Sequence, residues 1–112
     1  MTTIELPIRT YSLPNMRWHW ARKAKYAKQQ RQEVFLAVRA AGIRSAPDGA
    51  FVVRLVRIGK RRLDKDNLAA SWKHIQDSVA LAMGIDDGDP RIDWQYDQQI
   101  GKAYSVIITI GA

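Results

Sequence analysis

The chain has 112 residues, a hydrophobic content of 46%, no cysteine, a net charge of +7 and a pI near 10.1. This length favours one domain spanning residues 1–112, because two independent hydrophobic cores would not fit. The absence of cysteine excludes disulfides, thiolate metal sites and a cysteine nucleophile, so any bound metal would need oxygen or imidazole ligands.

The charge is distributed unevenly along the chain. Residues 1–62 hold 14 of the 18 Lys and Arg and 3 acids, which gives +11, whereas residues 63–112 hold 4 basic and 8 acidic residues, which gives −4. Basic surfaces attract polyanions such as nucleic acid, but carboxylates repel phosphates. A bound Mg²⁺ ion would reverse that repulsion, so the asymmetry favours a metal-dependent nuclease.

The sequence predicts no association with membranes. No apolar run of about 18 residues, the length needed to cross a bilayer, is present. The polar N-terminal residues Thr2, Thr3 and Glu5 are unlike a secretory signal. We therefore expect a cytoplasmic protein.

The first half of the chain is expected to form a strand, a long helix and a second strand. Residues 4–8 alternate between apolar and other residues, as in a strand that ends before the turn-forming residues 12–15. Residues 17–41 lack Gly and Pro and predict a helix that ends near Gly42. The β-branched residues 51–58 predict the next strand.

A second helix is expected after a basic loop at residues 59–62. Asp66 or Asn67 can cap its N-terminus, and the helical pattern runs to about Met83. Its apolar stripe consists of Leu68, Trp72, Ile75 and Val79. The following residues 85–90 combine Gly, Pro and three acids, so they are predicted to form a loop.

The remaining chain predicts two more strands. Residues 91–98 and 103–110 both alternate between apolar and polar side chains, and their short separation predicts a β-hairpin around residues 99–102. The resulting order is βαβαββ. It implies an α+β fold in which two helices pack on a mixed sheet.

Acidic residues lie at both ends of the second predicted helix. The first group is Asp64 and Asp66 with Asn67, and the second is Asp86, Asp87 and Asp89. Hard divalent cations prefer such oxygen ligands and activate water in phosphodiester hydrolysis. A straight helix keeps its ends roughly 25 Å apart, so a shared site needs the loop to fold back or a second subunit to contribute. Alternatively, Asp66 only caps the helix and the later aspartates only form a polar turn.

Lys73 has two interpretations. At about 100° per residue, Lys73 and Asp77 each lie roughly 20° from Asp66, on the side opposite the apolar stripe. Because helical side chains lean toward the N-terminus, its ammonium group could approach a phosphate held near Asp66. The alternative is an i,i+4 ion pair with Asp77 on a solvated face.

Two basic segments are candidate DNA contacts. The first contains Arg17, Arg22, Lys23, Lys25 and Lys28, and the second contains Lys60, Arg61 and Arg62. Aromatic residues such as Trp18 and Tyr26 interleave with the first segment and could stack on opened bases. Aromatic residues near a helix start can equally belong to the core or to a dimer contact. His19 and His74 lack metal-ligand spacing and are assigned no role.

Three features of the sequence resemble RusA-type Holliday junction resolvases. They are Leu63-Asp64-Lys65-Asp66-Asn67-Leu68 with its following amphipathic helix, Gly84-Ile85-Asp86-Asp87, and Leu13-Pro14-Asn15 before Trp18 and Trp20. The D-x-D-N element is common by itself. The basic strand and loop before it and the Gly-x-Asp-Asp turn after it make the resemblance more specific, and together the features cover most of the chain.

The resemblance implies a homodimer that cuts four-way DNA junctions symmetrically in recombination and repair, encoded by a prophage and active in a bacterial or phage-infected cell. Its cofactor would be Mg²⁺, with Mn²⁺ as a substitute, its partner would be branched DNA, and no small-molecule cofactor is implied. Asp64, Asp66 and Asp87 would be the metal-binding catalytic carboxylates, with Asp86 and Asn67 as alternative ligands. Asn15 would contact DNA.

The chain departs from the family pattern at one catalytic position. The family's lysine four residues after the second Asp is replaced by Ala70, and Lys73 is expected to stabilise the developing phosphate charge instead. This departure favours an alternative function, a non-catalytic junction-binding or architectural DNA-binding protein. A third interpretation is a protein-interaction module with incidental basic charge, which would show no salt-sensitive affinity for DNA.

Overall fold

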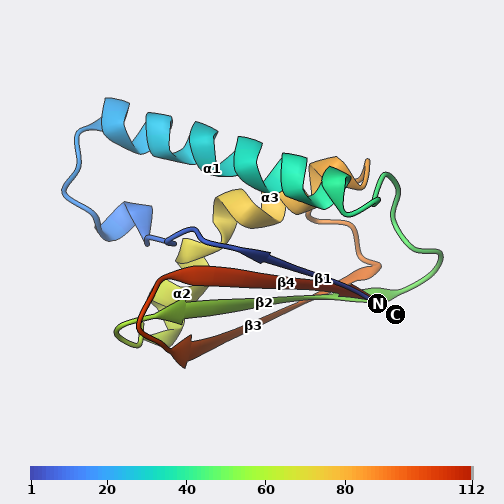
Figure 1. Ribbon diagram of the computed structural model, residues 1–112. Coiled ribbons are helices and arrows are strands. Elements are labelled where there is room, and N and C mark those ends of the chain that lie inside the picture. Colours follow the sequence, from blue (N-terminus) through green and yellow to red (C-terminus); the bar gives the residue numbers. More distant parts are fainter. Residues whose placement is uncertain (112) are drawn as a thin grey trace.

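The computed structural model describes residues 1–111, which form a sheet with helices over one of its faces (Figure 1). The elements are β1 (Thr2–Leu6), a short 3-10 helix (Leu13–Asn15), α1 (Trp20–Ala40), β2 (Phe51–Gly59), α2 (Lys65–Ser71), α3 (Lys73–Ala82), β3 (Ile92–Ile100) and β4 (Ser105–Gly111). The α+β class with a mixed sheet is therefore confirmed. Within the described residues, no helix combines the length and the apolar character needed to cross a membrane.

The four strands lie in the order β1-β4-β2-β3. β4 is antiparallel to both of its neighbours, whereas β3 is parallel to β2. The predicted hairpin around residues 99–102 is therefore wrong, because β2 separates β3 from β4. A helical crossover after β2 lays β3 parallel beside it, and the chain then passes the end of β2, where Gly101 N–H donates to the carbonyl of Gly59 at 2.9 Å.

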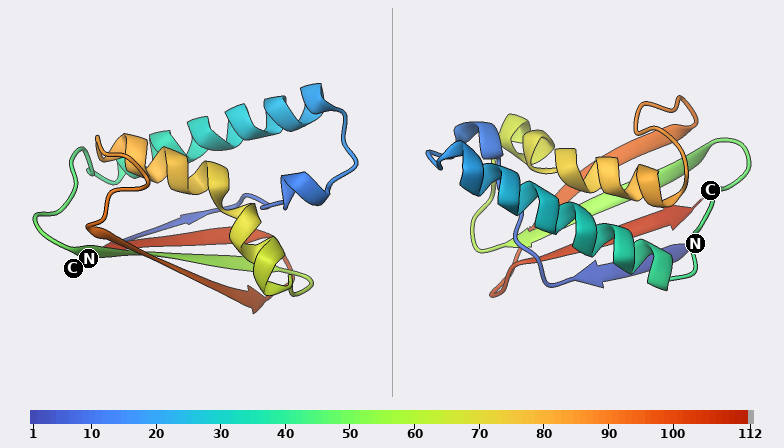
Figure 2. Two further views of the ribbon diagram at one scale, coloured as in Figure 1. Left: turned by 180° about the vertical axis from the view of Figure 1, so that it is seen from behind. Right: turned by 90° about the horizontal axis from the view of Figure 1, so that it is seen from above.

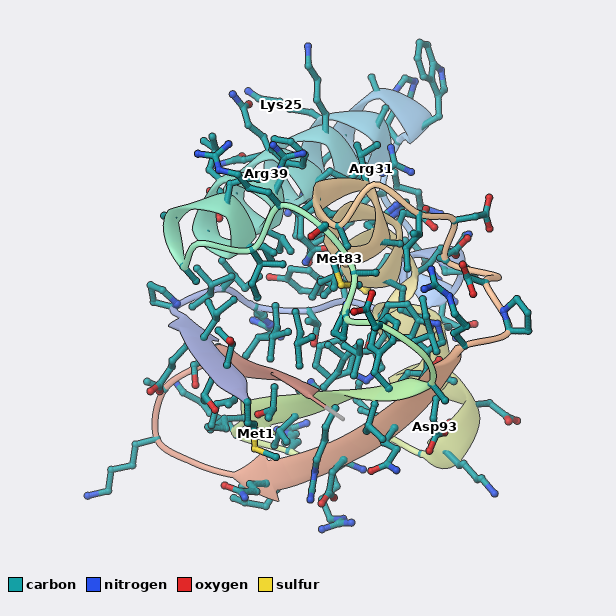
Figure 3. All side chains as sticks on the ribbon, turned by 90° about the vertical axis from the view of Figure 1, so that its right-hand side faces the viewer. Met1, Lys25, Arg31, Arg39, Met83 and Asp93 are labelled. Carbon is teal, nitrogen blue, oxygen red and sulfur yellow. The ribbon has the colours of Figure 1, made fainter. Side chains whose placement is uncertain are left out.

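The core lies between the sheet and the helices. Val53 and Leu55 of β2 and Ile108 of β4 point toward the helices and are fully buried. Val34 and Val38 of α1 cover them from above. Figure 3 shows Met83 in the same layer. The apolar stripe of Leu68, Trp72, Ile75 and Val79 is buried as predicted. Each such side chain contributes roughly 1.5–3 kcal/mol through removal from water.

Helix α1 begins later than the sequence pattern indicates. It starts at Trp20 rather than near Arg17, because His19 caps it: the imidazole Nδ1 accepts a hydrogen bond from Ala21 N–H at 3.2 Å. The predicted end is confirmed, because Gly42 adopts a left-handed φ of 89° that glycine alone tolerates easily.

The second predicted helix is two helices, which corrects the expectation of a continuous helix. Trp72 joins α2 to α3. Its backbone N–H donates to the carbonyl of Ala69 at 3.2 Å, three residues back, which is a tighter turn than that of an α-helix. Figure 2 shows α2 steeply inclined to α3. The N-cap is Asp64 rather than Asp66 or Asn67, because Asp64 has the extended backbone of a cap residue.

Candidate functional site

The D-x-D-N motif occupies the start of α2. The two carboxylate oxygens of Asp64 accept hydrogen bonds from the backbone N–H and the side-chain amide of Asn67, both at 2.8 Å. Asp66 lies in the first turn and is exposed. The residues of the motif therefore have different roles. Asp64 and Asn67 form the hydrogen bonds that cap α2, whereas the carboxylate of Asp66 is exposed to solvent beside them.

The Leu-Pro-Asn segment docks on this motif. The side-chain amide of Asn15 donates to the side-chain oxygen of Asn67, which is 52 residues away in sequence. The same amide donates to the hydroxyl of Ser12 at 3.0 Å, which fixes the short 3-10 helix. Ser12, Asn15, Asn67 and Asp64 thus form one chain of hydrogen bonds. Two sequence features on which the resemblance rests are adjacent in space.

Lys73 lies between two aspartates at the start of α3. Its Nζ is 3.0 Å from an oxygen of Asp77 and 3.5 Å from an oxygen of Asp87. The hydrogen bond to Asp77, with the charges of both aspartates, raises the pKa of Lys73 above its usual value. The i,i+4 ion pair with Asp77 that the spacing allowed is present, and the loop aspartate joins it.

The break at Trp72 changes the geometry that was expected for Lys73. The alignment of Lys73 with Asp66 assumed one straight helix, whereas the two residues lie on different helices. Lys73 instead contacts Asp77, which Arg31 of α1 also approaches at 3.7 Å. Partial burial raises the pKa of Asp77, but Lys73, Asp87 and Arg31 together bring it below its ordinary value. Figure 3 shows Arg31 on the side of α1 nearest α3.

The three loop aspartates have separate contacts. Asp86 accepts a hydrogen bond from Gly88 N–H at 2.7 Å, and Asp89 binds the guanidinium and backbone N–H of Arg91, which lowers the pKa of Asp89. The indole N–H of Trp94 donates to the carbonyl of Asp87 at 2.9 Å. Asp86 and Asp89 therefore stabilise the loop, while the carboxylate of Asp87 faces Lys73.

The donor chemistry suits Mg²⁺, but the arrangement does not gather the expected ligands. Asp64, Asp66 and Asn67 lie at the start of α2, and Asp87 lies beside Lys73. Within residues 1–111, no three acidic or histidine side chains are grouped closely enough to hold a metal ion. We therefore derive no reaction step through a metal from this geometry.

The predicted basic residues lie just before α1 (Arg17), along α1 and in the loop after β2. Arg17, Arg22, Lys25, Lys28, Lys60, Arg61 and Arg62 are exposed, and Lys23 is half-buried. Lys28 and Arg31 line a groove of about 690 Å³ between α1 and α3, which Asp77 and Asp87 also border. Arg31 is a site residue that the sequence analysis missed. Its position three residues after Lys28 could have identified it, because residues at this spacing lie on the same face of a helix.

His74 makes stability depend on pH. Partial burial lowers the pKa of His74, as does the charge of Arg31, and Asp77 partly offsets these effects. The unfolded chain therefore binds a proton more readily, so the stability linked to His74 is present above its ordinary pKa of 6.5 and is lost as pH falls through the folded value. We expect a lower urea midpoint at about pH 5.5 than at about pH 7.5. His74→Gln should reduce the difference between the urea midpoints at these two pH values. An unchanged difference in this variant would show that His74 does not cause the pH dependence.

Comparison with known proteins gives one informative relative. No protein-family model matches the chain. The sequence is 31% identical, over 116 residues, to an uncharacterized protein of Xylella fastidiosa strain Temecula1, and the match covers 98% of this chain and 76% of that protein. The chain belongs to the same family as this Xylella fastidiosa protein.

Proposed function

We propose that the protein is a structure-selective endodeoxyribonuclease of the RusA type that resolves four-way DNA junctions as a Mg²⁺-dependent homodimer. The observation that carries the proposal is the contact between Asn15 and Asn67. It joins the Leu-Pro-Asn segment to the D-x-D-N motif. Two polar segments that are 52 residues apart in sequence therefore share one surface at the start of α2.

The surroundings of this contact support an anionic substrate. A groove of about 550 Å³ between α1, the 3-10 helix and α2 is lined by Lys23, Arg31 and Lys73, with an apolar floor that includes Leu13 and Ala70. No carboxylate is in this lining, but Asp77 pairs with both Arg31 and Lys73, so Lys23 is the one of these three cations that forms no ion pair in the described chain. A phosphate backbone in this groove would lie between the cationic face of α1 and the helix that carries Asp66.

The proposal retains Mg²⁺, with Mn²⁺ as a substitute, as the cofactor. The ion would supply positive charge and an activated water molecule. Oxygen donors for it are Asp64, Asp66 and Asn67, with Asp87 as the most distant in sequence. Bringing Asp87 to the others requires movement of residues 84–91 or the second subunit of the proposed homodimer.

The decisive experiment uses a labelled synthetic four-way junction and a linear duplex of matched sequence. Purified protein is expected to make paired nicks near the crossover of the junction in Mg²⁺ and to leave the duplex intact. Chelation of the metal with EDTA should abolish the nicks without abolishing binding, because the basic residues of α1 need no metal to contact phosphates. Equal cleavage of junction and duplex would contradict structure selectivity.

A non-catalytic junction-binding or architectural protein is the second candidate. Two contacts favour it: Asn67 occupies both carboxylate oxygens of Asp64, and Lys73 pairs with Asp87. Ala70 stands where the family has its lysine. This candidate predicts tight, junction-selective binding in Mg²⁺ or Mn²⁺ with no nicks, so the same assay separates the two functions.

A further inference from the structure

A pocket of about 490 Å³ lies on a different face of α1 from the groove beside the D-x-D-N motif. The chain between β1 and α1 forms one wall, and the first half of α1 forms the other (Figure 1). Its lining combines three aromatic rings (Tyr11, Trp18 and Tyr26), three cations (Arg9, Arg22 and Lys25), Ile8, two glutamines and the carboxylate of Glu33. The volume is within the range of small-ligand sites.

Three aromatic rings form the pocket's apolar surface. Tyr11, Trp18 and Tyr26 pack edge to face, with ring centroids 4.8–5.7 Å apart. The side-chain amide of Gln30 donates to the Tyr26 hydroxyl at 2.6 Å, and that hydroxyl donates to the carbonyl of Arg9. These contacts hold the rings in place before any ligand arrives. Burial raises the pKa of Tyr26, so its phenol stays neutral and does not repel an anion.

The cations around the rings have no acidic partner. Within residues 1–111, Arg9, Arg22 and Lys25 form no ion pair. The guanidinium carbon of Arg22 lies 3.9 Å from the centre of the Trp18 ring, and that of Arg9 lies 4.6 Å from the centre of the Tyr11 ring. The one carboxylate of the lining, that of Glu33, accepts a hydrogen bond from Gln29. The pocket therefore combines aromatic rings, two of which lie under guanidinium groups, with an excess of positive charge.

We propose that this pocket binds an unpaired nucleotide of the DNA substrate, whose base takes the place of the Arg22 guanidinium over the Trp18 ring and whose phosphate is then bound by Arg22 and Lys25. A ligand that is both aromatic and anionic matches this lining, and a nucleotide has both properties. A base inside a paired duplex must first be unpaired and unstacked, which costs free energy, so an unpaired nucleotide offers its base face more readily. The inference rests on the proposed function only in taking DNA as the partner.

The test measures binding without cleavage. Fluorescence anisotropy in EDTA, at one fixed salt concentration, compares three labelled duplexes: fully paired, with a single unpaired thymidine, and with a single unpaired abasic nucleotide. The wild-type protein is expected to bind the thymidine-bulged duplex about tenfold more tightly than the paired one, the usual effect of stacking one base. The abasic duplex should lose this preference.

Matched variants locate the effect in the pocket. Trp18→Ala and Arg22→Gln should lose the preference for the unpaired thymidine, and Trp18→Phe should keep most of it because a ring remains. Trp20→Ala and Arg44→Gln remove the same groups outside the pocket and should keep it, since Trp20 is 74% exposed. Arg22 is exposed, so Arg22→Gln tests the site even where Trp18→Ala fails to fold.

Two results would overturn the inference: equal binding of paired and bulged duplexes by the wild type, or an unchanged preference in Arg22→Gln. Neither depends on nuclease activity. If the protein prefers the thymidine-bulged duplex but cuts no junction, the result supports nucleotide binding in the pocket and rejects the proposed function. Junction cleavage without any preference for the unpaired thymidine supports the proposed function and rejects the pocket.

Discussion

Trp72→Ala is expected to lower the free energy of unfolding by about 3–5 kcal/mol, the usual cost of truncating a buried tryptophan. Trp72 is 0% exposed and joins α2 to α3. Its loss would leave a cavity beside Leu68 and Ile75 in the same core and would free the relative orientation of the two helices. Urea denaturation followed by circular dichroism measures the change.

Two variants show whether burial causes this effect. Trp20→Ala removes an equally large but exposed ring and should change stability by no more than about 0.5 kcal/mol. Trp72→Phe keeps an aromatic ring and removes an indole N–H that is buried without a hydrogen-bond partner in the described chain. It should therefore cost much less than alanine. Similar losses in Trp72→Ala and Trp20→Ala would show that Trp72 does not anchor the core.

Asp66→Asn is expected to slow junction cleavage by roughly 10²–10³-fold, the range seen when one charge-stabilising group is removed from an active site. Binding of the junction should be unchanged or tighter, because the variant removes a negative charge near the phosphates. Asp66 is exposed and its side chain is not needed to cap α2, so the fold should be retained. Single-turnover cleavage and anisotropy on the same DNA separate the two effects.

The control for Asp66→Asn is Asp48→Asn, which removes an exposed carboxylate from the loop between α1 and β2. It should cleave at the wild-type rate. Lys73→Ala belongs in the same experiment, because Lys73 is proposed to stabilise the developing phosphate charge, and Lys102→Ala is its exposed control. Wild-type cleavage by Lys73→Ala would reject that role, and wild-type cleavage by Asp66→Asn would reject the carboxylate site.

Local patterns predicted which segments form helices and strands but not how the strands pair. The alternation in β3 and β4 was clear, and a short connection between two such strands usually makes a hairpin. Strand pairing also depends on the other strands of the sheet. Here β3 and β4 each pair with one edge of β2 instead of with each other. The break at Trp72 was also hidden, because Trp72 continues the apolar spacing of Leu68 and Ile75 across the joint.

The candidate site was predictable only in part. Residue chemistry identified the D-x-D-N motif and the basic face of α1, and the structure adds the contact between Asn15 and Asn67. The contact of Lys73 with Asp87 depends on how the chain returns after α3, which no short-range pattern encodes. The sequence indicated that Trp18 and Tyr26 with their neighbouring cations could stack on bases, but not that Arg9 and Tyr11 join them, because the path of the chain between β1 and α1 is not specified by a local pattern.

The strand order also governs when the protein can fold during its synthesis. β1 is made first, yet its only strand partner in the described chain is β4, with Leu6 opposite Val106 and Thr2 opposite Ile110. Until β4 leaves the ribosome, β1 and one edge of β2 remain open edges that can pair with another chain. Such distant pairings form slowly. A nascent chain released before residue 105 would therefore be prone to aggregate, because β4 is needed to join β1 to β2.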